Sequence, residues 1–244
     1  MIRLIAFAAL AVATGAAAQS RDPCRYEAER SANLEASRSD RLALIARAGS
    51  LRVEGRSGLT RVQVRGHACA SSEDLLEQLQ LESGRDGGVV RLEVPEIDDD
   101  DDWNFGRERY ARLDLVIEVP EGMAAEIEDG SGDAILRGLG RLRIVDGSGE
   151  LTIEEIAGTV TIEDGSGEIT IRGVQGDVTV DDGSGEIDVA RITGSVRIDD
   201  GSGSITVDDV SGDLTVSDDG SGSIRHSGVR GRVDVPVKER RRRI

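Results

Sequence analysis

Short runs of alternating apolar and polar residues fill most of the chain, and in its second half they recur at a fixed spacing. In one repeat, Ile169 and Ile171 alternate with polar residues, Val178 and Val180 do so again, and Val174 lies between the two runs. Alternation with a period of two is typical of half-buried β-strands. The same apolar places return in the neighbouring repeats, as Leu151, Ile153, Ile156, Val160 and Ile162, as Ile187, Val189, Ile192, Val196 and Ile198, and as Ile205, Val207, Val210, Leu214 and Val216. The pattern predicts two short strands in each repeat, with the same places facing inward every time.

The four residues Asp-Gly-Ser-Gly mark the period of the repeat. They begin at Asp129, Asp146, Asp164, Asp182, Asp200 and Asp219, so successive copies are 17, 18, 18, 18 and 19 residues apart. A fixed period indicates a stack of repeats, because one repeat alone has too few apolar residues to fold. The sequence therefore predicts an all-β fold, a single-stranded β-solenoid (β-helix) with rungs of about 18 residues. The structural alternative is an antiparallel β-sandwich, but sandwich strands rarely keep identical corners over so many copies.

Upstream of the regular repeats the alternation continues with less regular spacing. We interpret three apolar pairs as irregular N-terminal rungs: Leu42 and Leu44, Leu51 and Val53, and Val62 and Val64. Ser71 or Ser72 is expected to cap one helical turn that reaches Leu76. The expected organisation is a lead-in or cap at 19–47, irregular rungs at 48–128 with an acidic loop at 95–109, regular rungs at 129–236 and a basic tail at 237–244.

The first 18 residues have the pattern of a secretory signal peptide. Arg3 is followed by an apolar run from Leu4 to about Thr14 and by the small residues Ala16–Ala18, before a predicted cleavage near Ala18. The apolar run is too short to span a bilayer, and no later segment is long and apolar enough to do so. We therefore expect a periplasmic, secreted or cell-surface protein.

Two cysteines follow the predicted cleavage site, Cys24 and Cys69. An even number of cysteines in an oxidising compartment predicts one disulfide. Closing a loop of about 45 residues would stabilise the fold by roughly 4 kcal/mol in the chain-entropy model. A metal-binding or reactive cysteine pair is the alternative, but neither the spacing of the cysteines nor a neighbouring histidine supports it.

Charge and composition narrow the range of partners. The net charge is −17 and aromatic residues make up 2% of the chain. So acidic a surface repels nucleic acid and anionic lipid, so neither is expected as a partner. The expected partner is an unknown protein or glycan of the cell envelope, and self-association of the rod is a further possibility.

The repeat also resembles a known family. Its pattern is Gly-Ser-Gly, an acidic residue, aliphatic-Thr-aliphatic, then Gly and a second aliphatic-Thr-aliphatic, preceded by Leu115-Val-Ile-Glu-Val-Pro-Glu-Gly122. This is similar to the bacterial β-strand-repeat proteins called "putative adhesins", which are exported domains of unknown function, and the similarity covers about Ala48 to Val235. The resemblance implies an exported β-solenoid of the cell envelope and supplies no catalytic motif.

The residues give little support to catalysis. The chain has two histidines, His67 and His226, far apart in the sequence, and the Gly-Ser-Gly corners lack the lysine and helix of a phosphate loop. We therefore predict a non-enzymatic adhesin or surface scaffold of unknown ligand. An enzyme acting on polysaccharides remains as an alternative, because Asp188 and Arg197 interrupt the outward threonines of the repeat.

The repeated aspartates are the one candidate metal site. Stacked about 4.8 Å apart, the carboxylates of Asp129, Asp146, Asp164, Asp182, Asp200 and Asp219 would repel one another, and bound Ca²⁺ would relieve the repulsion. The resulting alternative function is a Ca²⁺-stabilised structural rod or self-assembling scaffold. The interpretation that we favour needs no cofactor: each aspartate hydrogen-bonds the backbone of its own corner, and glycine supplies the positive φ angle.

Overall fold

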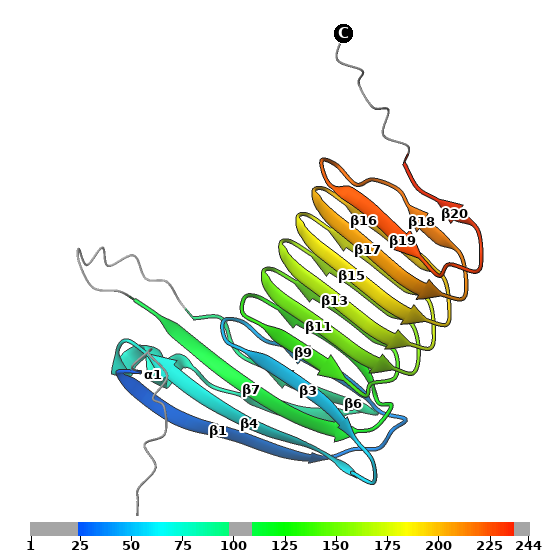
Figure 1. Ribbon diagram of the computed structural model, residues 1–244. Helices are drawn as coiled ribbons and strands as arrows, with labels where there is room; N and C mark the ends of the chain where they lie inside the picture. The colour runs from blue at the N-terminus through cyan, green and yellow to red at the C-terminus, as the bar shows by residue number, and fades with distance from the viewer. Residues whose placement is uncertain (1–23, 98–108, 237–244) are drawn as a thin grey trace, which may run out of the picture.

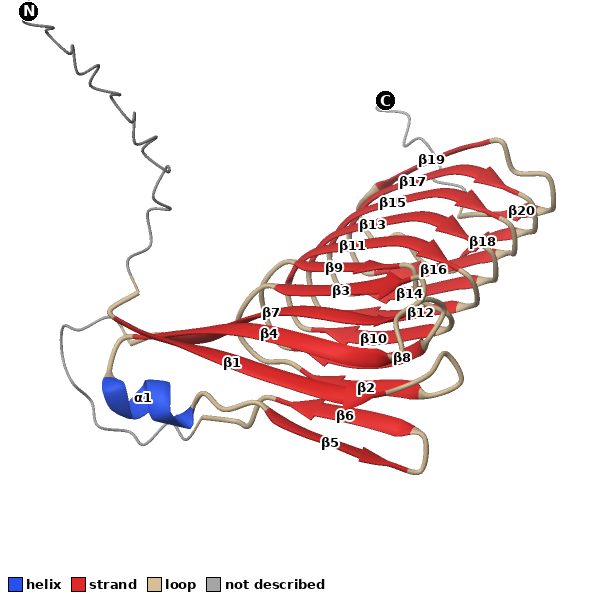
Figure 2. Ribbon diagram, turned by 90° about the horizontal axis from the view of Figure 1, so that it is seen from below, coloured by secondary structure: helices blue, strands red, loops and turns tan. Residues whose placement is uncertain are grey.

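The computed structural model describes residues 24–97 and 109–236, which form two large β-sheets joined into a solenoid (Figures 1 and 2). Each sheet has 10 strands. The described elements are β1 (Tyr26–Glu35), β2 (Arg41–Ile45), β3 (Leu51–Arg56), β4 (Arg61–Ala70), α1 (Glu73–Gln78), β5 (Glu82–Asp86), β6 (Val89–Glu93), β7 (Ala111–Pro120), β8 (Ala124–Asp129), β9 (Ala134–Arg137), β10 (Leu142–Asp146), β11 (Gly149–Ile156), β12 (Val160–Asp164), β13 (Gly167–Val174), β14 (Val178–Asp182), β15 (Gly185–Ile192), β16 (Val196–Asp200), β17 (Gly203–Val210), β18 (Leu214–Val216), β19 (Ser223–Ser227) and β20 (Val233–Asp234).

From β8 onward the chain winds as a two-sided solenoid, so the predicted fold is confirmed. Each rung gives one strand to each sheet, and each strand pairs in parallel with its equivalent in the next rung. The order is β9-β11-β13-β15-β17-β19 in the first sheet and β8-β10-β12-β14-β16-β18-β20 in the second. We call these sheet A and sheet B.

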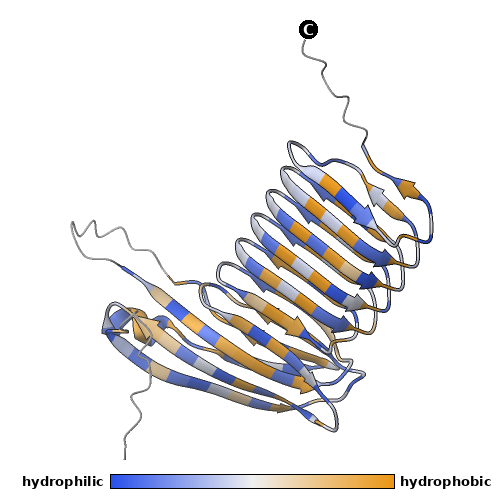
Figure 3. Cartoon of the chain, in the orientation of Figure 1, coloured by the Kyte–Doolittle hydropathy of each residue, from blue (hydrophilic) through white to orange (hydrophobic). Residues whose placement is uncertain are grey.

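The core is the narrow space between the two sheets. Inward residues such as Ile153 and Ile171 of sheet A and Ile162 and Val180 of sheet B are almost fully buried. Figure 3 shows the matching alternation of apolar and polar positions along the strands. Because aliphatic side chains of similar size fill this thin core in every rung, the protein needs few aromatic residues.

The N-terminal strands enter the stack out of chain order. β2 lies between β6 and β8 in sheet B, and β3 lies between β7 and β9 in sheet A. Residues 41–56 therefore form a rung that stacks directly under the rung of β8 and β9. Between these two rungs in the sequence, the chain forms the antiparallel strands β4 and β5 at the end of the molecule, and it adds β6 and β7 in parallel to β2 and β3.

The interpretation of Val62 and Val64 as a solenoid rung was wrong. Both lie in β4, which is antiparallel to β1 on one side and to β7 on the other. Alternation reports which face of a strand is buried but not the direction in which the strand runs. The pattern of a reversed strand therefore looks the same as that of a rung.

The end of the molecule nearest the N-terminus is a cap built from β1, β4, β5 and α1 (Figure 2). Within the predicted lead-in at 19–47, residues Tyr26–Glu35 form β1. The helical turn was predicted correctly, since the hydroxyl of Ser72 accepts a hydrogen bond from the amide of Leu75. In the described ranges, no helix is long and apolar enough to cross a membrane.

Three predicted features lie outside the described residues. They are the signal peptide at 1–18, most of the acidic loop at 95–109, including Asp98–Asp102, and the basic tail at 237–244.

The predicted disulfide between Cys24 and Cys69 is confirmed, with a Cα–Cα distance of 5.3 Å.

Candidate functional site

The repeated aspartates lie inside the solenoid, at the corner where sheet B turns into sheet A. Asp146 follows Leu142 and Ile144 in the inward phase of β10, and it is only 3% exposed. Strand pairing places the aspartates of successive rungs next to one another. We call the set in register the aspartate column: Asp129, Asp146, Asp164, Asp182 and Asp200. Asp219, also buried, occupies the next corner.

Part of the column caps its own corner, which agrees with the backbone interpretation. Oδ1 of Asp182 accepts a hydrogen bond from the amide of Ser184 at 3.1 Å, and Oδ1 of Asp200 accepts one from Ser202 at 2.9 Å. Oδ1 of Asp129 accepts one from Gly130. The remaining buried oxygens have no hydrogen-bond partner: Oδ2 of Asp129, Asp182 and Asp200, and both carboxylate oxygens of Asp146 and of Asp164.

Burial makes the column weakly acidic. Removal from water, reinforced by repulsion from Asp146, raises the pKa of Asp129 from 3.8 to about 7. Burial and a neighbouring column carboxylate likewise raise the pKa values of Asp146 and Asp182 to about 6. Nearby backbone amides offset only part of this effect. Burial is also the main cause of the raised pKa values of Asp164 and Asp200.

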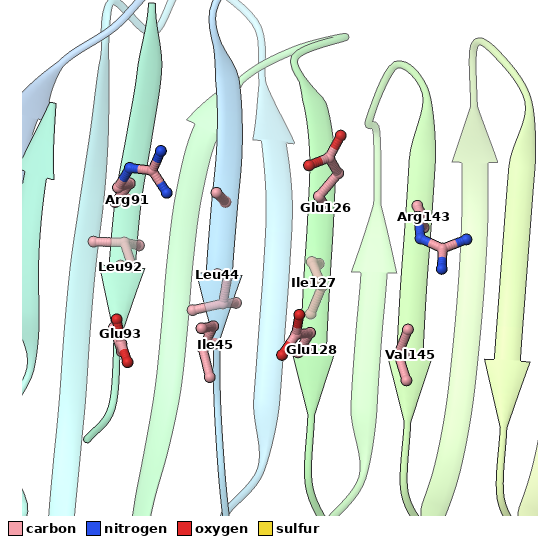
Figure 4. Close-up of a pocket in the computed structure, with 11 residues that line it drawn as sticks. Leu44, Ile45, Arg91, Leu92, Glu93, Glu126, Ile127, Glu128, Arg143 and Val145 are labelled. Atoms are coloured by element: carbon pink, nitrogen blue, oxygen red, sulfur yellow. The ribbon is translucent and has the colours of Figure 1, made fainter. Parts of the chain in front are cut away.

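A second candidate is a hollow of about 300 Å³ on the outer face of sheet B (Figure 4). It crosses β6, β2, β8 and β10, which are adjacent in the sheet. Outward residues form two rows across these strands. The first row is Arg91, Ala43, Glu126 and Arg143, and the second is Glu93, Ile45, Glu128 and Val145.

The floor of this hollow is apolar and its rim carries both signs of charge. Ala43 leaves space between Arg91 and Glu126, while Ile45 and Val145 are partly exposed beside it. Sequence reasoning missed the site because these four strands are not consecutive in the chain. A short outward side chain such as Ala43 is its only signal in the sequence, and that signal has no meaning until the strand order is known.

Asp188 and Arg197 do not form a common site. Asp188 lies on β15 in sheet A and Arg197 on β16 in sheet B, so they face opposite sides of the solenoid. Asp188 instead forms an ion pair with Arg172 at 3.1 Å. Asp188 and Arg172 line an open hollow of about 420 Å³, which also reaches Arg225 and His226 in the last rung. The two residues that suggested an enzyme for polysaccharides therefore lie on different faces.

One cluster of three metal-ligating residue types occurs in the described part of the chain. Cys24, Glu27 and His67 have potential ligand atoms within 4.8 Å of one another. The sulfur of Cys24 is bonded to Cys69, so it is not available as a thiolate. His67 lies two residues before Cys69 in β4 and beside the disulfide, so the expectation that no histidine neighbours the cysteines was wrong. The cluster is nevertheless not a metal centre while the disulfide is intact.

No protein-family model matches the chain, and neither does any curated protein. Among solved structures, a "putative adhesin" from Bacteroides fragilis is similar, with a TM-score of 0.55 and 15% sequence identity. The match covers 88% of this chain and 99% of the adhesin chain. A "putative cell adhesion protein" from Clostridium sporogenes has a TM-score of 0.39 at 12% identity, covering 86% and 99%. A "putative lipid binding protein" from Parabacteroides distasonis has a TM-score of 0.43 at 15% identity, covering 86% and 97%. The first similarity shows a shared fold and confirms, at that level, the resemblance seen in the sequence.

Proposed function

We propose that the protein is an exported, non-enzymatic β-solenoid of the cell envelope that acts as an adhesin or surface scaffold and binds a protein partner. The observation that carries this proposal is the hollow on the outer face of sheet B. The signal-peptide pattern supports export, and the fold shared with the protein from Bacteroides fragilis supports a role at the cell surface.

The chemistry of the hollow favours a protein over a glycan. Protein interfaces combine an apolar centre with a polar rim, as Ala43, Ile45 and the surrounding charges do here. None of its lining residues is aromatic, so the partner must be held by aliphatic contacts and ion pairs. A protein segment that carries both signs of charge meets these requirements.

Binding of the purified protein to extracted envelope proteins and to purified envelope polysaccharides tests the proposal. Ala43→Arg would fill the hollow, and we expect it to weaken binding of the protein partner at least tenfold. The matched control is Thr179→Arg, because Arg197 already occupies the equivalent outward place in the next rung. Binding that survives Ala43→Arg, or that is confined to polysaccharides, would contradict the proposal.

A further inference from the structure

The aspartate column is a run of buried acids without a compensating charge. None of its members forms an ion pair or a hydrogen bond with an arginine or histidine of the described chain. Asp200 is fully buried and Asp146 nearly so. Beyond each corner, the next inward residue is apolar, for example Leu151 after Asp146 and Ile169 after Asp164. An ionised carboxylate in such a place is costly unless something neutralises it.

The charged groups around the corner add to this cost because they are acidic too. The strands that carry the column present an exposed carboxylate at the preceding position, except β10, where Val145 precedes Asp146. Most strands across the corner, though not β17, present an exposed carboxylate at or near their first residue. The carboxylates that precede the column aspartates are Glu128, Glu163, Asp181 and Asp199, and Asp218 precedes Asp219 in the same way. The carboxylates across the corner are Asp133, Glu150, Glu168 and Glu186. Arg143 reaches Glu163 on the outer face, but not the column itself.

Two kinds of cation could neutralise the column, and the geometry favours one of them. Ca²⁺ takes about 6 to 8 oxygen ligands. The carbonyl oxygens of Asp129, Asp146 and Ser166 already accept hydrogen bonds from the amides of neighbouring rungs. Each gap in the column therefore offers mainly its two carboxylates, and carbonyl oxygens that already accept a ladder hydrogen bond do not supply the remaining ligands without distorting the stack. A proton needs no coordination shell, since a protonated carboxyl can donate directly to the carboxylate of the next rung.

We propose that the aspartate column is a row of proton-binding sites in which carboxyl groups of neighbouring rungs share protons in the folded protein. Folding then takes up protons from neutral solution, and the stability of the rod depends on pH in the direction opposite to that of most proteins. The raised pKa values of Asp129, Asp146 and Asp182 support this proposal.

The sign of the effect follows from the pKa difference between the two states. Unfolded aspartates have a pKa of 3.8, whereas in the folded protein the pKa is about 7 for Asp129 and about 6 for Asp146 and Asp182. Below pH 3.8 both states are protonated, so burial of the column costs no ionisation energy. Above pH 3.8 the unfolded aspartates lose their protons while the folded column keeps them, so stability falls as the pH rises and levels off above about pH 7, once the buried carboxylates have ionised.

Melting temperature measured from pH 4.5 to pH 8.5 tests the proposal. The variant Asp146→Asn/Asp164→Asn/Asp182→Asn keeps the shape of the column and removes its charge, while Asp181→Asn/Asp199→Asn removes exposed charge from the same corner. We expect the melting temperature of the wild type to fall by several degrees between pH 5 and pH 8. The column variant should have a flatter profile and a higher melting temperature at pH 8, and the control should follow the wild type.

Proton uptake gives a second measurement that does not depend on the size of the thermal shift. Calorimetric unfolding at pH 6 in two buffers of different ionisation enthalpy should show release of more than one proton from the wild type and fewer from the column variant. If the triple variant does not fold, Asp146→Ala replaces it, because Ala46 and Val94 occupy the equivalent inward place in earlier rungs.

Two results would overturn the proposal. Parallel pH profiles for the wild type and the column variant would show that the column does not bind protons. A melting temperature at pH 8 that rises with millimolar Ca²⁺ in the wild type, but not in the column variant, would show that metal ions neutralise the column instead.

Discussion

Glycine occupies two corner positions of the regular rungs for different physical reasons: one in every rung, as at Gly149, and one in only some of them, as at Gly173. Gly149 has a φ angle of +140°, and a Cβ atom there would lie 2.0 Å from the carbonyl oxygen of Gly132 in the rung below. Gly173 has a φ angle of +74°, but the nearest atom to its Cβ position is 3.7 Å away. Glu155 and Arg191 occupy the equivalent place with φ angles of 56° and 58°. Only the first position requires glycine sterically.

We therefore expect Gly149→Ala and Gly173→Ala to differ greatly in cost. Gly173→Ala should lower the free energy of unfolding by about 1 kcal/mol, which is the strain of a left-handed residue with a side chain. Gly149→Ala should cost more than about 3 kcal/mol, because the clash is with backbone that cannot move without breaking the ladder between rungs. Urea unfolding of both variants measures the difference, and equal costs would show that φ strain alone accounts for both glycines.

The aspartates show how far sequence reasoning reaches at single residues. Their spacing predicted the stack, and their chemistry suggested either a corner cap or a cation site. Alternation continued from Leu142 and Ile144 places Asp146 on the inward side, but a charged residue at the end of a strand and before a Gly-Ser-Gly turn fits an exposed corner equally well. Burial, and with it the raised pKa values, became visible only when the corner was closed.

Strands in the middle of the stack are held from both sides, unlike those at its end. Ile153 of β11 is fully buried and pairs with Leu136 below and Ile171 above. Ile224 of β19 pairs with Ile205 on one side only, and it is partly exposed. The same residue type, at two inward positions of the same sheet that lie two residues apart in the repeat, therefore has two different environments.

Ile153→Ala should lower the free energy of unfolding by about 2 to 5 kcal/mol, because it leaves a cavity between rungs that cannot collapse. Ile224→Ala removes less buried area and should cost about 1 kcal/mol or less. Denaturant unfolding of the two variants gives the comparison. A cost of Ile224→Ala close to that of Ile153→Ala would mean that the last rung is covered by another chain in solution.

The strands of the regular rungs could be predicted because their partners are a fixed distance away in the sequence. The partners of the N-terminal strands could not, because these strands pair across long and unequal separations: β3 pairs with β7 and β9, and β2 with β6 and β8. Apolar alternation carries no information about such partners. The hollow on sheet B was missed for the same reason, since it exists only where β6 and β2 come together.

At the scale of the whole molecule, the cap and the regular rungs differ in what stabilises them. Each regular rung is stabilised mainly by its two neighbours, as in other repeat proteins. The cap also has a covalent link, since the disulfide joins Cys24, just before β1, to Cys69 of β4 across 45 residues. The disulfide should therefore matter mainly to one end of the rod.

Removing the disulfide with Cys24→Ser/Cys69→Ser should lower the free energy of unfolding of the cap by about 4 kcal/mol in the chain-entropy model. Stability in a stack of repeats is largely local, so the regular rungs should keep theirs. Hydrogen exchange resolves the two regions: amides of β1 and β4 should lose protection in the variant, and those of β13 and β15 should not. Reductant should reproduce the effect in the wild type and change nothing in the variant. Equal loss of protection in β13 and β15 would instead mean that cap and rungs unfold as one cooperative unit, with the cap sealing the end from which the stack opens.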